Sequence, residues 1–117
     1  MLNVIVAKPW GSYQILLDDH YTKVKKIIVK PKQSLSYQYN FKRSEVWVIV
    51  GGNAKIKLDG EDRYYDKGDT INIPVKSKHL IANESDEDLI FIEVQSGEYF
   101  GEDDIMRLED NLRKDIV

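Results

Sequence analysis

Four polar residues of this chain carry side chains that can bind a metal ion. Gln38 and Asn40 lie two positions apart, Glu45 follows, and His79 comes after a proline in the string GDTINIPVKSKHLIAN. Together they supply two amide oxygens, one carboxylate and one imidazole, which is enough for a four-ligand site. The oxygen-rich set suits a harder divalent ion better than a soft one. One hypothesis is therefore a divalent metal centre.

Each of these residues also has a purely structural interpretation. A single histidine is a weak signal for a metal, and buried amides on strands often only satisfy backbone groups. Glu45 lies in an apolar strand, where an unpaired carboxylate is costly. Lys25 or Arg43 could neutralise it without any metal, and Lys25 could instead extend to the rim of a barrel. Both interpretations stay open at this level.

The elements that must position these residues are short strands separated by turn signals. Strands at roughly 8–12-residue spacing are typical of an all-β sandwich or barrel. The expected strands are VKKIIVKP (24–31), SLSYQYNF (34–41), EVWVIVGG (45–52), AKIKLDG (54–60), DRYY (62–65), TINIP (70–74), HLIAN (79–83) and LIFIEVQ (89–95). An Asp-Gly turn is expected to close 54–60.

Strand alternation decides which side chains can share a surface. The two amides of strand 34–41 share one face, Glu45 lies on the face of Trp47, and His79 lies on the face of Ile81. If all these faces point inward, a short barrel brings the four candidate ligands together at one depth. The PWGSY segment (9–13) is expected to hold the N-terminal part by packing Trp10 and turning at Gly11.

Near the end of the chain, the spacing of the apolar residues changes from that of a strand to that of a helix. In DDIMRLEDNLRKDI (103–116) the apolar residues have the spacing of a helix face. These residues are Ile105, Leu108, Leu112 and Ile116. Asp103 and Asp104 stand where a helix N-terminus favours negative charge. We expect a short C-terminal helix packed on the barrel.

Bulk properties limit the functional classes. The 117 residues suit one domain spanning 1–117, and the net charge of −3 gives no reason to bind nucleic acid. There are no cysteines, so disulfides and thiolate metal sites are excluded. The apolar start MLNVIVAKPWG is too short for a signal peptide, and no stretch approaches the roughly 20 apolar residues that span a bilayer. A cytoplasmic protein without a membrane partner is expected.

Two spacings resemble the motifs of the cupin superfamily. The second motif is matched by Gly68, Pro74, His79 and Asn83, with Lys76 at the place of a usual glycine. The first motif usually runs His-x-His, three or four residues, Glu, six residues, Gly. Here the corresponding residues are Gln38, Asn40, Glu45 and Gly52, so the glutamate and the spacing match while both histidines are replaced.

A longer resemblance covers nearly the whole chain. The stretches KPWGSY, VKKIIVKP, LSYQYNFKRSEVWVIVGGNAKIKLDGE, INIPVKSKH and IEVQSGEYFGEDDIMRLED are similar to the C-terminal cupin domain of type II mannose-6-phosphate isomerases. In that family the domain is often fused to a mannose-1-phosphate guanylyltransferase. The resemblance implies a double-stranded β-helix (jelly-roll) barrel and the interconversion of mannose 6-phosphate and fructose 6-phosphate.

The resemblance also implies roles for residues. A divalent metal, zinc or a harder ion such as manganese or calcium, would be held by Gln38, Asn40, Glu45 and His79, with Asn40 standing where the family has histidine. The expected catalytic residues are Lys25, Arg43 and Glu45. The expected contacts to the sugar phosphate are Arg43, Glu93, Gln95 and Arg107. A homodimer is expected too, with Tyr37, Tyr39 and Phe41 as an aromatic interface.

Departures from the family keep alternatives open. An amide is a poorer donor than imidazole for zinc-like ions, so the metal is expected to bind weakly or to be absent. Leu112 and Arg113 replace a Tyr-Gly pair usual in the family, which puts a substrate contact from that end in doubt. The alternative is a non-catalytic cupin that binds a sugar phosphate, a nucleotide sugar or a protein. A nucleotide-sugar epimerase is disfavoured, because His79 would be the one barrel histidine available.

Overall fold

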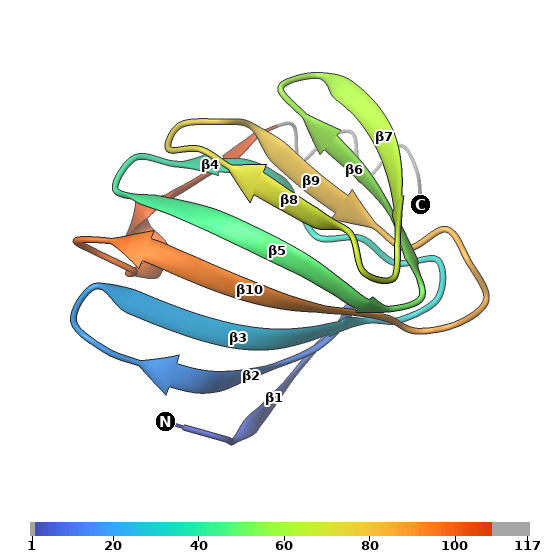
Figure 1. Ribbon diagram of the computed structural model, residues 1–117, viewed down its shortest axis with the longest axis horizontal. Coiled ribbons are helices and arrows are strands. Elements are labelled where there is room, and N and C mark those ends of the chain that lie inside the picture. Colours follow the sequence, from blue (N-terminus) through green and yellow to red (C-terminus); the bar gives the residue numbers. More distant parts are fainter. Residues whose placement is uncertain (1, 109–117) are drawn as a thin grey trace.

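Two antiparallel sheets face each other in the computed structural model, which describes residues 2–108 (Figure 1). One sheet has the order β1-β2-β3-β10-β5-β8 and the other has the order β11-β4-β9-β6-β7. The strands are β1 (Ile5–Lys8), β2 (Gly11–Asp18), β3 (Thr22–Val29), β4 (Tyr37–Asn40), β5 (Arg43–Gly51), β6 (Asn53–Leu58), β7 (Glu61–Asp66), β8 (Thr70–Ile73), β9 (His79–Ala82), β10 (Leu89–Gly97) and β11 (Ile105–Leu108). The predicted all-β architecture is confirmed.

Strand alternation produced the sheets that the sequence predicts. All eight expected strands are present, with ends displaced by a few residues. The predicted turn between β6 and β7 is also present: Leu58 pairs with Glu61, and Asp59 and Gly60 have φ of 48° and 85°. Both values lie in the left-handed region that a two-residue hairpin turn of this type requires.

The inner faces of the two sheets form a barrel with an apolar half and a polar half. On β10 the buried side chains run from Leu89 and Phe91 to Glu93 and Gln95, and β5 runs in the opposite direction beside it. The apolar half consists of Ile27, Val29, Trp47, Ile49, Ala54, Ile56, Ile71, Ile73, Ile81, Leu89 and Phe91. This half carries the hydrophobic stabilisation, so the other half is free to bury polar groups.

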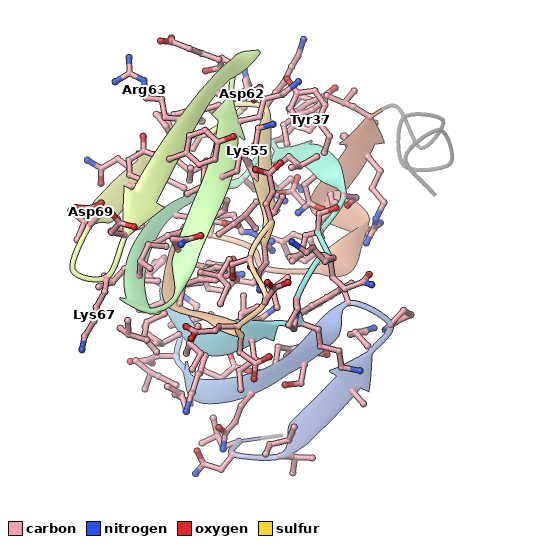
Figure 2. The ribbon with its side chains drawn as sticks, turned by 90° about the vertical axis from the view of Figure 1, so that its right-hand side faces the viewer. Tyr37, Lys55, Asp62, Arg63, Lys67 and Asp69 are labelled. Carbon is pink, nitrogen blue, oxygen red and sulfur yellow. The ribbon has the colours of Figure 1, made fainter. Side chains whose placement is uncertain are left out.

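The outward side of the second sheet is polar, as alternation requires. Figure 2 shows Arg63 and Lys67 pointing away from the barrel. Lys55 on β6 lies 3.9 Å from Asp62 on β7 and 3.5 Å from Glu84. These surface pairs contribute little to stability, because solvent screens them.

The predicted C-terminal helix is wrong over the residues that the structure describes. After a single 3-10 turn (Glu102–Asp104), residues Ile105–Leu108 form β11, which pairs with β4. The Asp104 carboxylate accepts the backbone N–H groups of Phe41 and Lys42 at 3.3 and 2.9 Å, which brings the segment to the edge of β4. Backbone pairing at a sheet edge therefore outweighs a helical spacing over one turn. The expected helix residues Leu112 and Ile116 lie outside the described residues.

The first two strands form a hairpin that the sequence did not predict. Gly11 begins β2 at a point where the backbone of β3 is so near that a Cβ would lie 1.9 Å from the carbonyl oxygen of Ile28. Glycine is therefore required there, and it lets β2 pair with β3. Trp10 packs against the apolar core, as predicted. Among residues 2–108, no helix has the length and apolar character needed to cross a membrane.

Asn83 organises the connection between β9 and β10. Its side chain is 1% exposed, and its amide nitrogen donates to the carbonyl oxygens of Val29 at 2.9 Å and Glu87 at 2.7 Å. Its amide oxygen accepts the backbone N–H of Ser85 at 3.0 Å and the Ser85 hydroxyl at 2.8 Å. The motif residue Asn83 thus ties the turn to β3.

We predict that Asn83→Ala lowers the free energy of unfolding by about 2–3 kcal/mol, because it leaves buried carbonyl groups without donors. Urea unfolding followed by circular dichroism measures this. The control is Asp86→Ala, whose side chain is 94% exposed beside Lys32. The control should stay within about 0.5 kcal/mol of the wild type. Equal stabilities of the two variants would contradict the structural role of Asn83.

Candidate functional site

A cavity of about 300 Å³ lies at the polar half of the barrel. Its wall draws on both sheets and on the segment before β4. The lining residues are Lys8, Pro9, Trp10, Tyr13, Lys25, Ile27, Leu35, Ser36, Gln38, Arg43, Glu93, Ile105 and Arg107. Chemically active side chains from strands far apart in the sequence therefore meet in one concave site.

The wall of the cavity is strongly cationic. Lys8, Lys25, Arg43 and Arg107 line it, against the single carboxyl group of Glu93. Lys25 Nζ lies 4.9 Å from the ring centroid of Tyr13, and Lys8 Nζ lies 5.9 Å from the same ring. The chain as a whole has a net charge of −3, whereas the side chains that line this cavity have a net positive charge. Such a cavity favours an anionic ligand.

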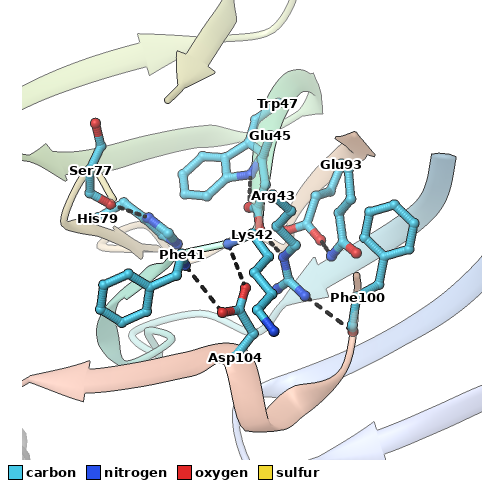
Figure 3. A network of polar contacts seen from close by, with 11 residues as sticks. Phe41, Lys42, Arg43, Glu45, Trp47, Ser77, His79, Glu93, Phe100 and Asp104 are labelled. Carbon is cyan, nitrogen blue, oxygen red and sulfur yellow. Dashed lines mark hydrogen bonds and ion pairs between the residues drawn. The ribbon is translucent and has the colours of Figure 1, made fainter. Parts of the chain in front are cut away.

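A buried ion pair lies at one side of the cavity (Figure 3). Arg43 Nε donates to Glu45 Oε2 at 3.0 Å, and the two side chains are 4% and 2% exposed. The other carboxylate oxygen, Oε1, accepts the indole N–H of Trp47 at 2.9 Å. Arg43 Nη1 also donates to the carbonyl oxygen of Phe100 at 3.3 Å. Of the two partners predicted for Glu45, a cation or a metal, the structure shows the cation.

Glu93 is the second buried carboxyl group. Its Oε1 accepts the amide of Gln95, and Lys25 is its direct neighbour on β3. Burial and, after it, the negative charge of Glu45 raise the pKa of Glu93 to about 7, against the opposing effect of Lys25 and Arg43. Gln95 Oε1 is buried and has no hydrogen-bond partner among the described residues. Glu93 can therefore change its protonation state near neutral pH.

His79 lies on β9, across the barrel from Trp47. Its Nδ1 is 3.1 Å from the carbonyl oxygen of Ser77, and its ring meets the Trp47 ring edge-on with centroids 5.4 Å apart. Burial lowers the pKa of the imidazole. Gln38 is its partner across β4 and β9. Gln38 Oε1 also accepts the hydroxyl of Ser36 at 2.8 Å.

The predicted site residues divide into two groups. Those that line the cavity are Lys25, Gln38, Arg43, Glu93 and Arg107. Those that are buried but do not line it are Asn40, Glu45, His79 and Gln95. Their catalytic, substrate-binding and metal-binding roles stay predictions. The same holds for the homodimer.

The donor set does not fit a resident metal ion. Both oxygens of Glu45 already accept hydrogen bonds, one of them from a guanidinium. Asn40 stands where the family has an imidazole. Its amide nitrogen is buried and has no hydrogen-bond partner among the described residues. Within the described part of the chain, no three His, Cys, Asp or Glu side chains form a cluster that could hold a metal. One imidazole and two neutral amides are then a weak set for zinc and for harder ions alike.

Sequence reasoning missed three polar residues of the cavity wall. Lys8 and Tyr13 come from the unpredicted hairpin of β1 and β2, and Ser36 precedes β4. The sequence did hold signals for them, because KPWGSY is one of the stretches that carry the family resemblance. Ser36 also shares the strand parity of Gln38.

Comparison with known proteins identifies the family. The family model described as "Mannose-6-phosphate isomerase C-terminal" matches residues 2–110. The chain belongs to this family. A mannose-1-phosphate guanylyltransferase of Salmonella montevideo is 42% identical over 105 residues, and the alginate biosynthesis protein AlgA of Pseudomonas aeruginosa is 43% identical over 105 residues. In both cases the match covers 90% of this chain and 22% of the relative.

Solved structures confirm the cupin fold. A RmlC-like cupin from Shewanella frigidimarina superposes with a TM-score of 0.75 at 22% identity, covering 86% of this chain and 87% of that one. The capsular polysaccharide assembling protein CapF from Staphylococcus aureus has a TM-score of 0.81 at 22% identity, covering 91% and 34%. At these identities the likeness concerns the fold alone.

The raised pKa of Glu93 predicts a specific pH dependence of stability. The folded state favours the protonated carboxyl, so this contribution is complete below the ordinary value of 4.5 and is lost as pH rises through about 7. The Glu93→Gln variant lacks this contribution at every pH. Its unfolding free energy relative to that of the wild type should therefore rise by about 3 kcal/mol as pH increases over this range.

Urea unfolding at several pH values between these limits measures the effect. The matched control is Glu87→Gln, an exposed glutamate whose curve should follow the wild type. Parallel curves for wild type and Glu93→Gln would show that Glu93 titrates normally. The charged groups that act on Glu93 are Glu45, Lys25 and Arg43, and all three are retained in both variants.

Proposed function

We propose that this chain is an aldose–ketose isomerase of a sugar phosphate, with mannose 6-phosphate and fructose 6-phosphate as the first pair to test. The observation that carries the proposal is the buried carboxyl of Glu93 beside Lys25 in a cavity lined by four basic residues. Membership of the mannose-6-phosphate isomerase C-terminal family supports it. The relatives are longer proteins, since the match covers 22% of their length, so their activities are not carried over as a whole.

Glu93 is suited to move the proton in this reaction. Aldose–ketose isomerisation moves a proton from the carbon next to the carbonyl group to the carbonyl carbon, through an enediol, while a hydroxyl proton passes from one of the two oxygens to the other. A carboxyl with a pKa near 7 can take up the proton and give it back at neutral pH. The hydrogen bond from Gln95 holds its orientation. We assign Glu93 as the general base.

Lys25 is suited to stabilise the charge that forms on the substrate. When the proton leaves carbon, negative charge develops on the carbonyl oxygen, and a cation in a partly closed cavity stabilises it. Lys25 lies on the strand beside Glu93, in direct register with it, so base and cation share one wall of the cavity. Arg43 adds positive charge next to them, with its orientation set by Glu45 and Phe100.

The phosphate group is assigned to the basic residues from the outer strands. Lys8 on β1 and Arg107 on β11 line the same cavity from opposite sheets, and both are exposed to solvent. A guanidinium can hold phosphate through two parallel hydrogen bonds, and an ammonium adds a point charge. This leaves the half-buried Lys25 and the buried Glu93 for the reacting carbons.

A second candidate function is binding of a sugar phosphate without turnover. The observation that favours it is the state of Glu45, a predicted catalytic residue that does not line the cavity and whose carboxylate is held by Arg43 and Trp47. Glu93 is then the one carboxyl group on the cavity wall. Turnover and binding are separate measurements, so the two functions can be distinguished.

For the isomerase, we predict that Glu93→Gln lowers kcat by about 10²–10⁴-fold, because the base is lost while the shape is kept. The assay follows conversion of fructose 6-phosphate to mannose 6-phosphate. Glu87→Gln, on the exposed turn before β10, should retain the wild-type rate. Unchanged turnover in Glu93→Gln would remove Glu93 from the reaction. Absence of turnover in the wild type would defeat the isomerase.

For either function, fructose 6-phosphate should raise the unfolding temperature and unphosphorylated fructose should not. Binding to the folded state stabilises it by about 2.7 kcal/mol when the ligand is at 100 times its Kd. Lys25→Gln should reduce the shift, while Lys26→Gln should retain it. These neighbours lose the same charge, yet only Lys25 lines the cavity. Equal shifts in both variants would place the ligand elsewhere, and a shift without turnover would select the second function.

A further inference from the structure

We propose that the Arg43–Glu45 ion pair takes the place of a metal in this barrel, so that the chain binds no divalent ion at its predicted metal centre. The inference concerns the ion content of the site and goes beyond the reaction proposed above. Its consequence for catalysis, that Lys25 and Arg43 supply the positive charge, rests on the proposed function. Three observations carry the inference.

The first observation is the charge balance around Glu45. The carboxylate and the Arg43 guanidinium are 2% and 4% exposed and lie 3.0 Å apart, so together they are neutral. The other predicted ligands, Gln38, Asn40 and His79, are uncharged when they donate to a metal. A divalent ion would therefore leave a net positive charge in a buried site beside Arg43, and the neighbouring Glu93 carboxyl could offset one unit of it at most. Burial without compensation is costly, because little water is present to screen the charge.

The second observation is how firmly the ion pair is held. Glu45 Oε1 accepts the indole N–H of Trp47, whose ring packs against His79 and Phe91 with centroid distances of 5.4 Å in both cases. Arg43 Nη1 is fixed by the carbonyl oxygen of Phe100 at 3.3 Å. A metal that bound Glu45 would have to share the carboxylate with a guanidinium that is held by two acceptors.

The third observation is the weakness of the remaining donors. His79 is the one imidazole among the four candidate ligands, and its Nδ1 faces the carbonyl oxygen of Ser77, so Nε2 is the single ring nitrogen left for an ion. Asn40 has a buried amide nitrogen without a partner in the described part of the chain. Neutral amides do not replace the imidazoles that zinc prefers or the carboxylates that calcium and manganese prefer.

The decisive experiment measures metal content directly. The full chain is purified without a metal-affinity step, treated with EDTA, incubated with Co²⁺ or Zn²⁺ and desalted. Elemental analysis then gives the metal bound per chain, and visible absorption reports coordinated Co²⁺. We expect no stoichiometric metal and no Co²⁺ absorption band in the wild type. One tightly bound ion per chain would overturn the proposal.

Two variants test whether Arg43 is the reason that no metal ion binds. Asn40→His restores a second imidazole but keeps the ion pair, and it should still bind no stoichiometric Co²⁺. Asn40→His combined with Arg43→Gln also frees Glu45, and it should gain a Co²⁺ absorption band with one ion per chain. Stoichiometric binding by Asn40→His alone would show that Arg43 does not exclude the metal, which would overturn the proposal.

Failure of the double variant has a clear meaning in each case. If it folds, as shown by circular dichroism, and binds no Co²⁺, the ion pair is not what occupies the place of the metal, and the proposal is overturned. If it does not fold, wild type and Asn40→His still decide the matter. The isomerase assay is kept separate: turnover of fructose 6-phosphate that is unchanged by EDTA supports both proposals, whereas no turnover with or without metal defeats the isomerase and leaves the metal measurements valid.

Discussion

The burial of Glu45 between Arg43 and Trp47 is the interaction on which the polar half of this barrel depends. A carboxylate at 2% exposure needs compensation, and here it has a guanidinium on one oxygen and an indole N–H on the other. The same contacts fix the direction of Arg43 and hold Trp47 against His79. The negative charge that remains near Glu93 is one cause of the raised pKa of that residue. One ion pair thus influences the shape of the site and its proton chemistry together.

The apolar core lies at one end of the barrel, and the polar side chains of the site lie at the other end. Paired strands β5 and β10 carry large apolar side chains at one end and charged or amide side chains at the other. Because the apolar end forms a continuous core with residues such as Phe91 and Ile49, the fold can bear buried charge at the opposite end. This arrangement gives Glu93 a low-dielectric environment without exposing it to bulk water.

The family relationship and the geometry are informative about different properties. The match over residues 2–110 establishes the family, and solved cupins establish the fold. The geometry of the centre differs from a metal site at two residues, at Asn40 and at the Glu45 carboxylate, whose two oxygens accept hydrogen bonds from Arg43 and Trp47. The cationic wall formed by Lys8, Lys25 and Arg107 is compatible with a phosphorylated sugar either way.

The sequence by itself determined eight of the eleven described strands and placed Glu45 on the face of Trp47, because alternation has a period of two and is readable from local residue types. It also placed Gln38 and His79 on faces that could share one barrel interior, and the structure pairs these two residues across β4 and β9. Only the tertiary structure decided that Arg43, rather than Lys25, pairs with Glu45, and that Ile105–Leu108 extends a sheet instead of forming a helix. It likewise brought Lys8 and Tyr13 to the cavity. The physical reason is that pairing partners and charge compensation are contacts between distant segments, and local periodicity contains no information about which distant segment will provide them.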